Sequence, residues 1–220
     1  QKALVSRKVR HHPAVIHREK LGALLRAIET YNGYPSTQNA LRITPHLFQR
    51  PGEIRQMLWA DVDLDAGRWA LPAAVMKSRR DHEVPLSSQA ITIIRSQQDV
   101  AGESEFVFPS FKSTKTPISE NTVNQALARL GYKDIMTAHG FRSTASTLLN
   151  ESGRWRFDVI EAALAHQDKN QVRRIYNQST YWDERVAMMQ WWSDELDVLK
   201  GSGAKTRADP AALFRPPTRQ

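Results

Sequence analysis

The sequence contains no cysteine among its 220 residues. This absence excludes disulfide bonds and thiolate metal ligands, and it suits the reducing cytoplasm in which we expect the protein to work. The chain also lacks any run of about 18 apolar residues, which a membrane-spanning helix requires. No secretory signal precedes the first predicted helix. We therefore expect neither a membrane span nor a secreted, disulfide-stabilised domain.

Metal-ligand patterns are also scarce. Asp61, Asp63 and Asp65 have the alternate spacing of a calcium-binding loop. Such a loop needs glycine at its sixth position and glutamate at its twelfth, where this sequence has Ala66 and Pro72. We interpret the segment as a turn that leads into a strand, and we expect neither a metal nor an organic cofactor.

Positive charge is what the sequence has in excess. Lysine and arginine number 31 against 23 aspartates and glutamates, which gives a net charge of +8 and a pI near 9.9. A basic surface of this kind suits a polyanionic partner such as nucleic acid. Charge alone is equally compatible with a protein that binds no nucleic acid, so the decision depends on particular residues.

The chain divides into three parts by composition. Residues 1–16 are basic and irregular and are interpreted as a basic linker or arm. The cluster of His11, His12 and His17 lacks a regular set of metal-ligand partners and is interpreted as part of this basic arm. Residues 17–200 have the apolar content of one folded domain. Residues 201–220 are rich in glycine, proline and arginine, which is typical of a flexible tail.

Apolar periodicity predicts a mainly helical fold with a small antiparallel sheet (an α+β fold). The first helix carries Leu21, Leu24, Leu25 and Ile28 on one face and ends near residues 32–33. Thr180 with Asp183 is expected to cap the last helix. Further helices are predicted over about 36–47, 51–60, 119–130, 139–151, 157–165, 169–178 and 182–199, with strands over 67–74, 82–87 and 106–110.

Six residues in five short motifs are candidates for chemistry. They are Arg50 in QRPGE, Lys77 in MKSRR, His139 and Arg142 in HGFR, His166 in LAHQ and Tyr176 in RRIYN. Each also has a plain structural interpretation. The arginine, the lysine and the histidines could be surface charges, turn residues or helix caps, and the tyrosine could belong to the core.

The six candidate residues taken together indicate a function more clearly than any one of them does. His139 and Arg142 are three residues apart and so share one helix face, at a helix N-terminus that favours an anion. Arg50 stands at the start of another predicted helix. Two arginines and two histidines that converge would clamp a phosphate and stabilise the extra charge of a pentacoordinate phosphorus. A nearby tyrosine would supply the nucleophile.

The order of these residues resembles the phage integrase family of tyrosine recombinases. R-x-x-E is followed by a lysine in a β-hairpin, H-x-x-R, a second histidine and a tyrosine after nine intervening residues. The flanking text also resembles integrases of prophages and genomic islands, from about residue 17 to 199. The similar segments are RPGEIRQMLWADVDL, MKSRRDHEVPLS, FVFPS, ISENTVNQAL, HGFRSTASTLLNE and IYNQSTYWDERVAMMQWW.

The resemblance implies a site-specific recombinase whose catalytic domain spans residues 17–200. Tyr176 would attack the scissile phosphate, Arg50 and Arg142 would clamp it, and Lys77 would protonate the leaving 5′-oxygen. His139 and His166 would assist proton transfer and hold the phosphate. Glu53 would orient Arg50 or cap its helix. Tyr181 lies five residues beyond Tyr176, and no comparable cluster of cations is expected around it.

The resemblance also implies partners. They are double-stranded DNA, a tetramer of protomers on two DNA sites and, in some systems, accessory DNA-bending factors. Family members carry an N-terminal helical domain that clamps DNA, for which residues 1–18 are too short, so either this sequence or the natural protein is truncated. Two other functions stay open. They are a relaxing enzyme of the type IB topoisomerase class and a DNA-binding remnant without catalysis.

Overall fold

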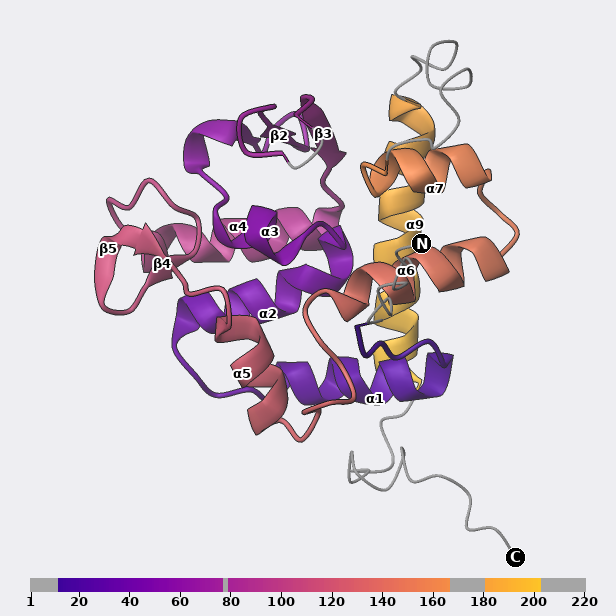
Figure 1. The fold of residues 1–220 in the computed structure, drawn as a ribbon, viewed down its shortest axis with the longest axis horizontal. Helices are drawn as coiled ribbons and strands as arrows, with labels where there is room; N and C mark the ends of the chain where they lie inside the picture. Colours follow the sequence, from indigo (N-terminus) through magenta and orange to yellow (C-terminus); the bar gives the residue numbers. More distant parts are fainter. Residues whose placement is uncertain (1–11, 77–78, 167–180, 203–220) are drawn as a thin grey trace, which may run out of the picture.

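Helices form most of this protein, and two small antiparallel sheets lie at one side of them (Figure 1). The computed structural model describes residues 12–76, 79–166 and 181–202. The elements are α1 (Arg18–Glu29), α2 (Pro35–Leu47), α3 (Pro51–Arg55), η1 (Trp59–Asp61), β1 (Val62–Asp63), β2 (Arg68–Leu71), β3 (His82–Pro85), α4 (Ser88–Ala101), β4 (Pro109–Ser110), β5 (Ser113–Pro117), α5 (Thr122–Arg129), α6 (Gly140–Glu151), α7 (Phe157–Ala163) and α9 (Trp182–Gly201). The predicted fold class is confirmed.

Helix α2 is the centre of the core. It contacts α1, α3, α4, α5, α6 and α9, and most of its residues are buried. Helix α9 runs the height of the molecule from α7 to α1 (Figure 1). Its close approach to α1 depends on Gly22, since a Cβ there would lie 2.4 Å from the carbonyl oxygen of Leu199.

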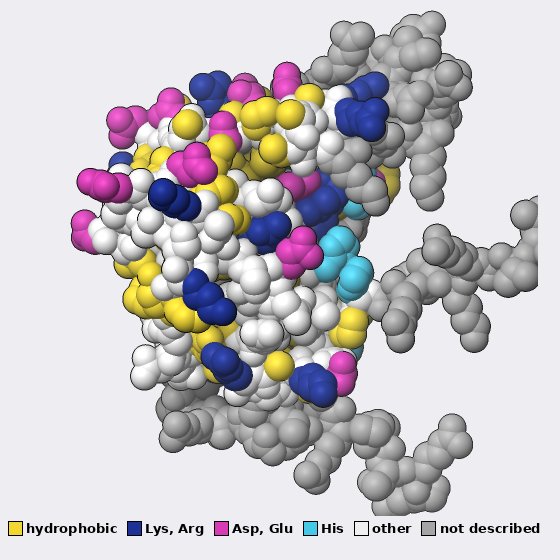
Figure 2. All heavy atoms as spheres, turned by 60° about the vertical axis from the view of Figure 1, so that its left-hand side comes forward, with side chains coloured by type: hydrophobic (Ala, Val, Ile, Leu, Met, Phe, Trp, Pro, Cys, Tyr) yellow, Lys and Arg dark blue, Asp and Glu magenta, His cyan; other side chains and the backbone are white. Residues whose placement is uncertain are grey.

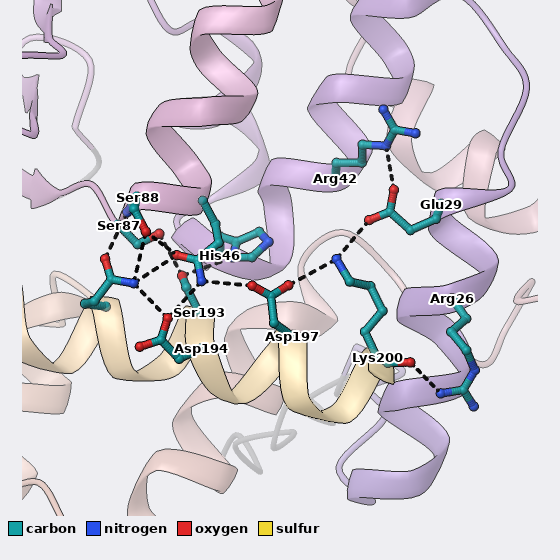
Figure 3. Close-up of polar contacts among 12 residues, drawn as sticks. Arg26, Glu29, Arg42, His46, Ser87, Ser88, Ser193, Asp194, Asp197 and Lys200 are labelled. Carbon is teal, nitrogen blue, oxygen red and sulfur yellow. Dashed lines mark hydrogen bonds and ion pairs between the residues drawn. The ribbon is translucent and has the colours of Figure 1, made fainter. Parts of the chain in front are cut away.

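A chain of polar contacts fixes α9 against α1, α2 and α4 (Figure 3). The buried His46 of α2 lies 3.0 Å from the Ser193 hydroxyl, through its Nδ1 atom. Lys200 lies 3.1 Å from Asp197 and 3.2 Å from Glu29. Burial lowers the pKa of His46 to about 4, so its ring is neutral at neutral pH. The C-terminal helix is therefore an integral part of the domain.

Helix α4 was not among the sequence predictions. Its N-cap is Ser87, whose hydroxyl accepts a hydrogen bond from the backbone N–H of Ala90 at 3.2 Å. Its buried residues, Ala90, Ile94, Gln97 and Ala101, have the spacing of one helix face. Two of the four are alanine and one is glutamine, so the apolar signal in the sequence is weak.

The prediction of a helix over residues 51–60 is wrong beyond Arg55. Leu58 instead forms an isolated β-bridge with Phe106. The backbone N–H of Val107 donates to the carbonyl of Met57 at 2.9 Å, and the N–H of Trp59 donates to Glu105 at 3.0 Å. A segment some fifty residues away therefore takes the backbone groups that a longer helix would have used.

The main sheet has the strand order β1-β2-β3, with antiparallel pairs throughout. Trp69 pairs with Val84 across it, and both side chains are buried. The Asp63 carboxylate accepts from the backbone N–H groups of Asp65 and Ala66, at 3.1 and 2.8 Å. This confirms the predicted turn into the strand. The predicted strand over 106–110 is shorter than expected. Phe106 makes only an isolated bridge, and the strand itself is β4, which pairs with β5 in a separate two-stranded sheet.

The C-terminal part of the fold consists of α5, α6, α7 and α9 in chain order. The helix predicted over 169–178 lies outside the described residues. The N-cap of α9 is Tyr181, not Thr180 as predicted, and its backbone is left-handed with φ of 48°. Asp183 and Glu184 lie in the first turn of α9, where carboxylates interact favourably with the helix dipole. No helix within the described ranges is long and apolar enough to cross a membrane.

Candidate functional site

Arg50 lies at the junction between α2 and α3. Phe48, which has a left-handed backbone, is the C-cap of α2, and Arg50 is the N-cap of α3. The buried Glu53 accepts from the Arg50 guanidinium at 2.8 Å and from the Arg50 backbone N–H at 3.0 Å. Both functions expected for Glu53 are confirmed, since it orients the Arg50 side chain and caps the helix.

Arg142 lies in the first turn of α6 and is only 4% exposed. Its guanidinium donates to the carbonyl of Phe48 at 3.0 Å and to the carbonyl of Leu164 at 2.7 Å. Burial, followed by the charge of Arg50, lowers the pKa of Arg142 to about 10. The guanidinium therefore stays charged at neutral pH and connects the end of α2 to the end of α7.

His139 is the N-cap residue of α6. Its ring lies 4.3 Å from the ring of His12, centroid to centroid. Burial, then His12 and Arg142, lower the pKa of His139 to about 4, so the imidazole is neutral at neutral pH. The contact with His12 was missed by the sequence analysis, which treated that histidine only as part of a basic arm.

The N-terminal segment before α1 crosses the start of α6. The carbonyl of Pro13 accepts from the Thr137 N–H at 3.2 Å, and the carbonyl of Val15 accepts from the Thr144 hydroxyl at 2.8 Å. Gly140 is required by this crossing, because a Cβ there would lie 2.2 Å from the Pro13 carbonyl oxygen. This packing brings His12 to the candidate site.

His166 follows the C-terminal end of α7. The His166 N–H bonds the carbonyl of Glu161, and the Ala165 N–H bonds the carbonyl of Ala162, each at 3.1 Å. With the left-handed backbone of Ala165, φ 49°, this is a Schellman motif. The Nδ1 atom of His166 lies 3.1 Å from the Glu161 carboxylate. Backbone and carboxylate together fix the orientation of the imidazole.

Four of the six predicted residues share one electrostatic environment. Arg142, Arg50 and His166 all lower the pKa of His139, and Arg50 lowers the pKa of Arg142. Figure 2 shows arginine or lysine side chains next to histidine side chains on one face of the molecule. The four come from three separate helix ends, and together they make a site suited to an anion.

The other two predicted residues, Lys77 and Tyr176, lie outside the described residues. Tyr181 is described, and the Arg156 guanidinium lies 4.9 Å from its ring centroid. A single guanidinium is not a cluster comparable to that of Arg50, Arg142, His139 and His166, so this contact does not contradict the expectation for Tyr181. Its ring packs against the hydrophobic core.

Arg185 of α9 also approaches this region, and the sequence analysis did not single it out. It is 3% exposed, and its guanidinium donates to the carbonyl of Glu83 in β3 at 2.6 Å. Burial lowers its pKa to about 10, so it remains a cation. In the described parts of the chain, no group of three or more histidines, aspartates and glutamates is placed to hold a metal ion.

Comparisons with solved structures identify the fold. The fold matches an integrase from mycobacterium phage Brujita with a TM-score of 0.61 at 16% identity, over 84% of this chain and 59% of that one. It matches a lambda integrase, whose structure is a dimer bound to a core site, with a TM-score of 0.55 at 17% identity, over 73% and 60%. The fold is thus that of the tyrosine recombinase catalytic domain.

The sequence comparisons identify the family. The model of the phage integrase family matches residues 14–182. Prophage integrase IntZ of Escherichia coli K12 is 42% identical over 87% of this chain and 47% of its own length. Prophage integrase IntA of the same organism is 50% identical over 66% of this chain and 35% of its own length. The chain belongs to the phage integrase family, and it spans less than half the length of these two relatives.

Proposed function

We propose that this chain cleaves and rejoins DNA at specific sites through a 3′-phosphotyrosyl intermediate, in the integration or excision of a mobile element. The observation that carries the proposal is the convergence of Arg50, Arg142, His139 and His166 from separate helix ends. Relatives named as prophage integrases support it. The intact set of candidate residues argues against a remnant that binds DNA without cutting it.

The two arginines form the proposed phosphate clamp. Arg50 is held by Glu53, and Arg142 is held by the backbone carbonyls of Phe48 and Leu164. A clamp fixed in advance stabilises the charge that develops on the phosphoryl oxygens and needs little reorganisation during the reaction. His139 and His166 complete the clamp as hydrogen-bonding groups.

Tyr176 and Lys77 are the proposed nucleophile and general acid. The Tyr176 oxygen gives its proton to one of the clamp histidines, His139 or His166, and forms a bond to phosphorus, while the bond from phosphorus to the 5′-oxygen breaks. Lys77 gives a proton to that oxygen, which leaves as a 5′-hydroxyl. Rejoining reverses the step with a 5′-hydroxyl from another strand. The phosphotyrosyl ester retains the bond energy, so the reaction consumes no ATP.

The proposed partners are double-stranded DNA and further copies of the protein. A lambda integrase has been observed as a tetramer bound to a Holliday junction, and we propose that this protein forms a comparable tetramer on two DNA sites in the cytoplasm. Accessory DNA-bending factors would assist the assembly in some reactions.

The experiment is covalent capture on labelled, nicked suicide duplexes, drawn from a pool of randomised sequence so that no target site has to be assumed. A DNA-linked protein band on a denaturing gel, formed in excess chelator, is the expected result, because arginine and lysine side chains meet the charge on phosphorus. No linked band under any condition would contradict the proposed function. A band that forms only with added magnesium would contradict the proposed metal-free chemistry.

A further inference from the structure

Gln49 is a buried polar residue directly before Arg50. Its side chain is 1% exposed, and its Nε2 atom donates to the carbonyl of Ala163 at 2.7 Å. Its Oε1 atom is buried and has no hydrogen-bond partner among the residues that the structure describes. A leucine would fill a similar volume without the cost of an unsatisfied acceptor.

His82 is a partly buried polar residue that also lies near the backbone of Ala163. It is the first residue of β3 and pairs with Leu71 of β2. Its Nε2 atom is buried, and no described residue hydrogen-bonds to it. Burial, then Arg185, lower its pKa to about 4, whereas the nearby backbone of Ala163 raises it. The ring is therefore neutral at neutral pH, and it approaches the same backbone group as Gln49.

The backbone that these residues reach is the C-terminal end of α7. The last carbonyls of a helix have no partner within the helix. At this end, the Gln49 side chain donates a hydrogen bond to the carbonyl of Ala163, and the Arg142 guanidinium donates one to the carbonyl of Leu164. His166 follows two residues later, in the Schellman motif. One helix end thus carries a contact to α2–α3, a contact to α6 and a residue of the candidate site.

The Gln49 Oε1 and His82 Nε2 atoms, buried without a hydrogen-bond partner in the described part of the chain, do not stabilise the fold. Buried polar groups without partners are rare in folded proteins, and those that persist need a reason. Here Gln49 bonds the end of α7, and His82 lies near enough for the backbone of Ala163 to influence its pKa, at the helix end that also bonds Arg142 and precedes His166.

We propose that Gln49 and His82 are positioning residues, which hold the end of α7 between the α2–α3 junction and strand β3 so that Arg142 and His166 meet the phosphate together with Arg50. This inference rests on the proposed function, because it assumes that these three bind the scissile phosphate. Neither Gln49 nor His82 needs to touch the DNA.

The test measures the single-turnover rate of covalent complex formation at saturating DNA, together with DNA affinity and melting temperature. The variants are Gln49→Leu, His82→Phe and His82→Gln. Gln97→Leu is the matched control, since Gln97 is also a fully buried glutamine, bonded to Ser36 and Asn39 between α2 and α4. It lets a general loss of stability be separated from a loss of alignment.

We expect Gln49→Leu and His82→Phe each to react about ten-fold more slowly than Gln97→Leu, by analogy with residues that orient metal ligands, while DNA affinity stays close to that of the wild type. His82→Gln keeps a neutral hydrogen-bonding side chain and should react at close to the wild-type rate. Because the two positions are tested separately, one variant that fails to fold leaves the other to decide.

Rates equal to that of Gln97→Leu would overturn the inference, as would a His82→Gln protein as slow as His82→Phe. In both cases the wild type still forms the covalent complex, so the proposed function stands. If the wild type forms no covalent complex, the proposed function fails and the inference fails with it.

Discussion

Arg142 combines a structural and a proposed catalytic role in one side chain. A guanidinium has five N–H donors in a fixed fork, and two of its nitrogens already donate to the carbonyls of Phe48 and Leu164. The other N–H donors take no part in these two bonds. The two bonds fix the orientation of the guanidinium and so the direction in which those donors point. The two backbone carbonyls therefore require the planar guanidinium fork, and a positive charge alone would not satisfy both of them.

The first prediction concerns this fork. Arg142→Lys keeps the charge but loses the paired donors, so we expect cleavage to fall by about 10²-fold or more while DNA binding changes little. Arg26→Lys is the control, because Arg26 also donates to two backbone carbonyls, those of Leu199 and Lys200, away from the site. Equal losses of binding and cleavage would make Arg142 a docking residue instead.

The second prediction concerns His139. Its pKa is about 4 in the free protein, and a bound phosphate would raise that pKa by favouring the charged ring. Between the two pKa values the complex then binds more protons than the free protein, so DNA affinity should rise as the pH falls from about 7 to about 5. Binding isotherms across this range should show a flatter pH dependence for His139→Gln. Identical slopes for the two proteins would argue against a phosphate beside His139.

At the scale of elements, the C-terminal end of α7 organises the site. Ala165 has a left-handed backbone, φ 49°, at the position where a Schellman motif usually has glycine. The strain is local, and it is tolerated because the motif places His166 and leaves the last carbonyls to Gln49 and Arg142.

The third prediction follows from that strain. Ala165→Gly should raise the free energy of unfolding by about 1 kcal/mol, because glycine adopts the left-handed conformation without a Cβ clash. Ala162→Gly, one turn earlier in the helix, should lower it by about 1 kcal/mol, since glycine is a poor helix former. Urea unfolding of both variants measures the difference. The same sign of change for both would contradict the assigned conformation.

Local sequence pattern predicted the elements that local interactions determine. The R-x-x-E spacing was enough to foresee the contact between Arg50 and Glu53, because both lie within one helical turn. The end of α3 could not be foreseen, since it depends on the bridge from Leu58 to Phe106. For the same reason the contact of His12 with His139 was missed, because only the folded chain brings the two together.

Over the whole molecule, the net charge of +8 gives the fourth prediction. Phosphate contacts release counterions, so DNA affinity should fall steeply as salt is raised. Contacts to the phosphate backbone carry no base information, so this salt-dependent part of the affinity should be similar on unrelated duplexes. Titrations at several salt concentrations, on two unrelated duplexes, measure both effects. An affinity independent of salt would show that the basic surface is not the DNA-binding face.

The central claim is that Tyr176 is the nucleophile of a phosphate site built by Arg50 and Arg142. Tyr181 is the natural comparison. Its ring packs against the core beside Arg156, and its left-handed backbone begins α9, which gives it a structural role without placing it in the clamp. A phenol has a pKa near 10 and needs nearby cations or a base to react.

The most direct measurement is the mapping of the DNA-linked peptide from labelled suicide duplexes for the wild type, Tyr176→Phe and Tyr181→Phe. We predict that the wild-type peptide carries the DNA on Tyr176, that Tyr176→Phe binds DNA without forming the covalent complex, and that Tyr181→Phe still forms it. A covalent complex that survives Tyr176→Phe, or one mapped to Tyr181, would contradict the account.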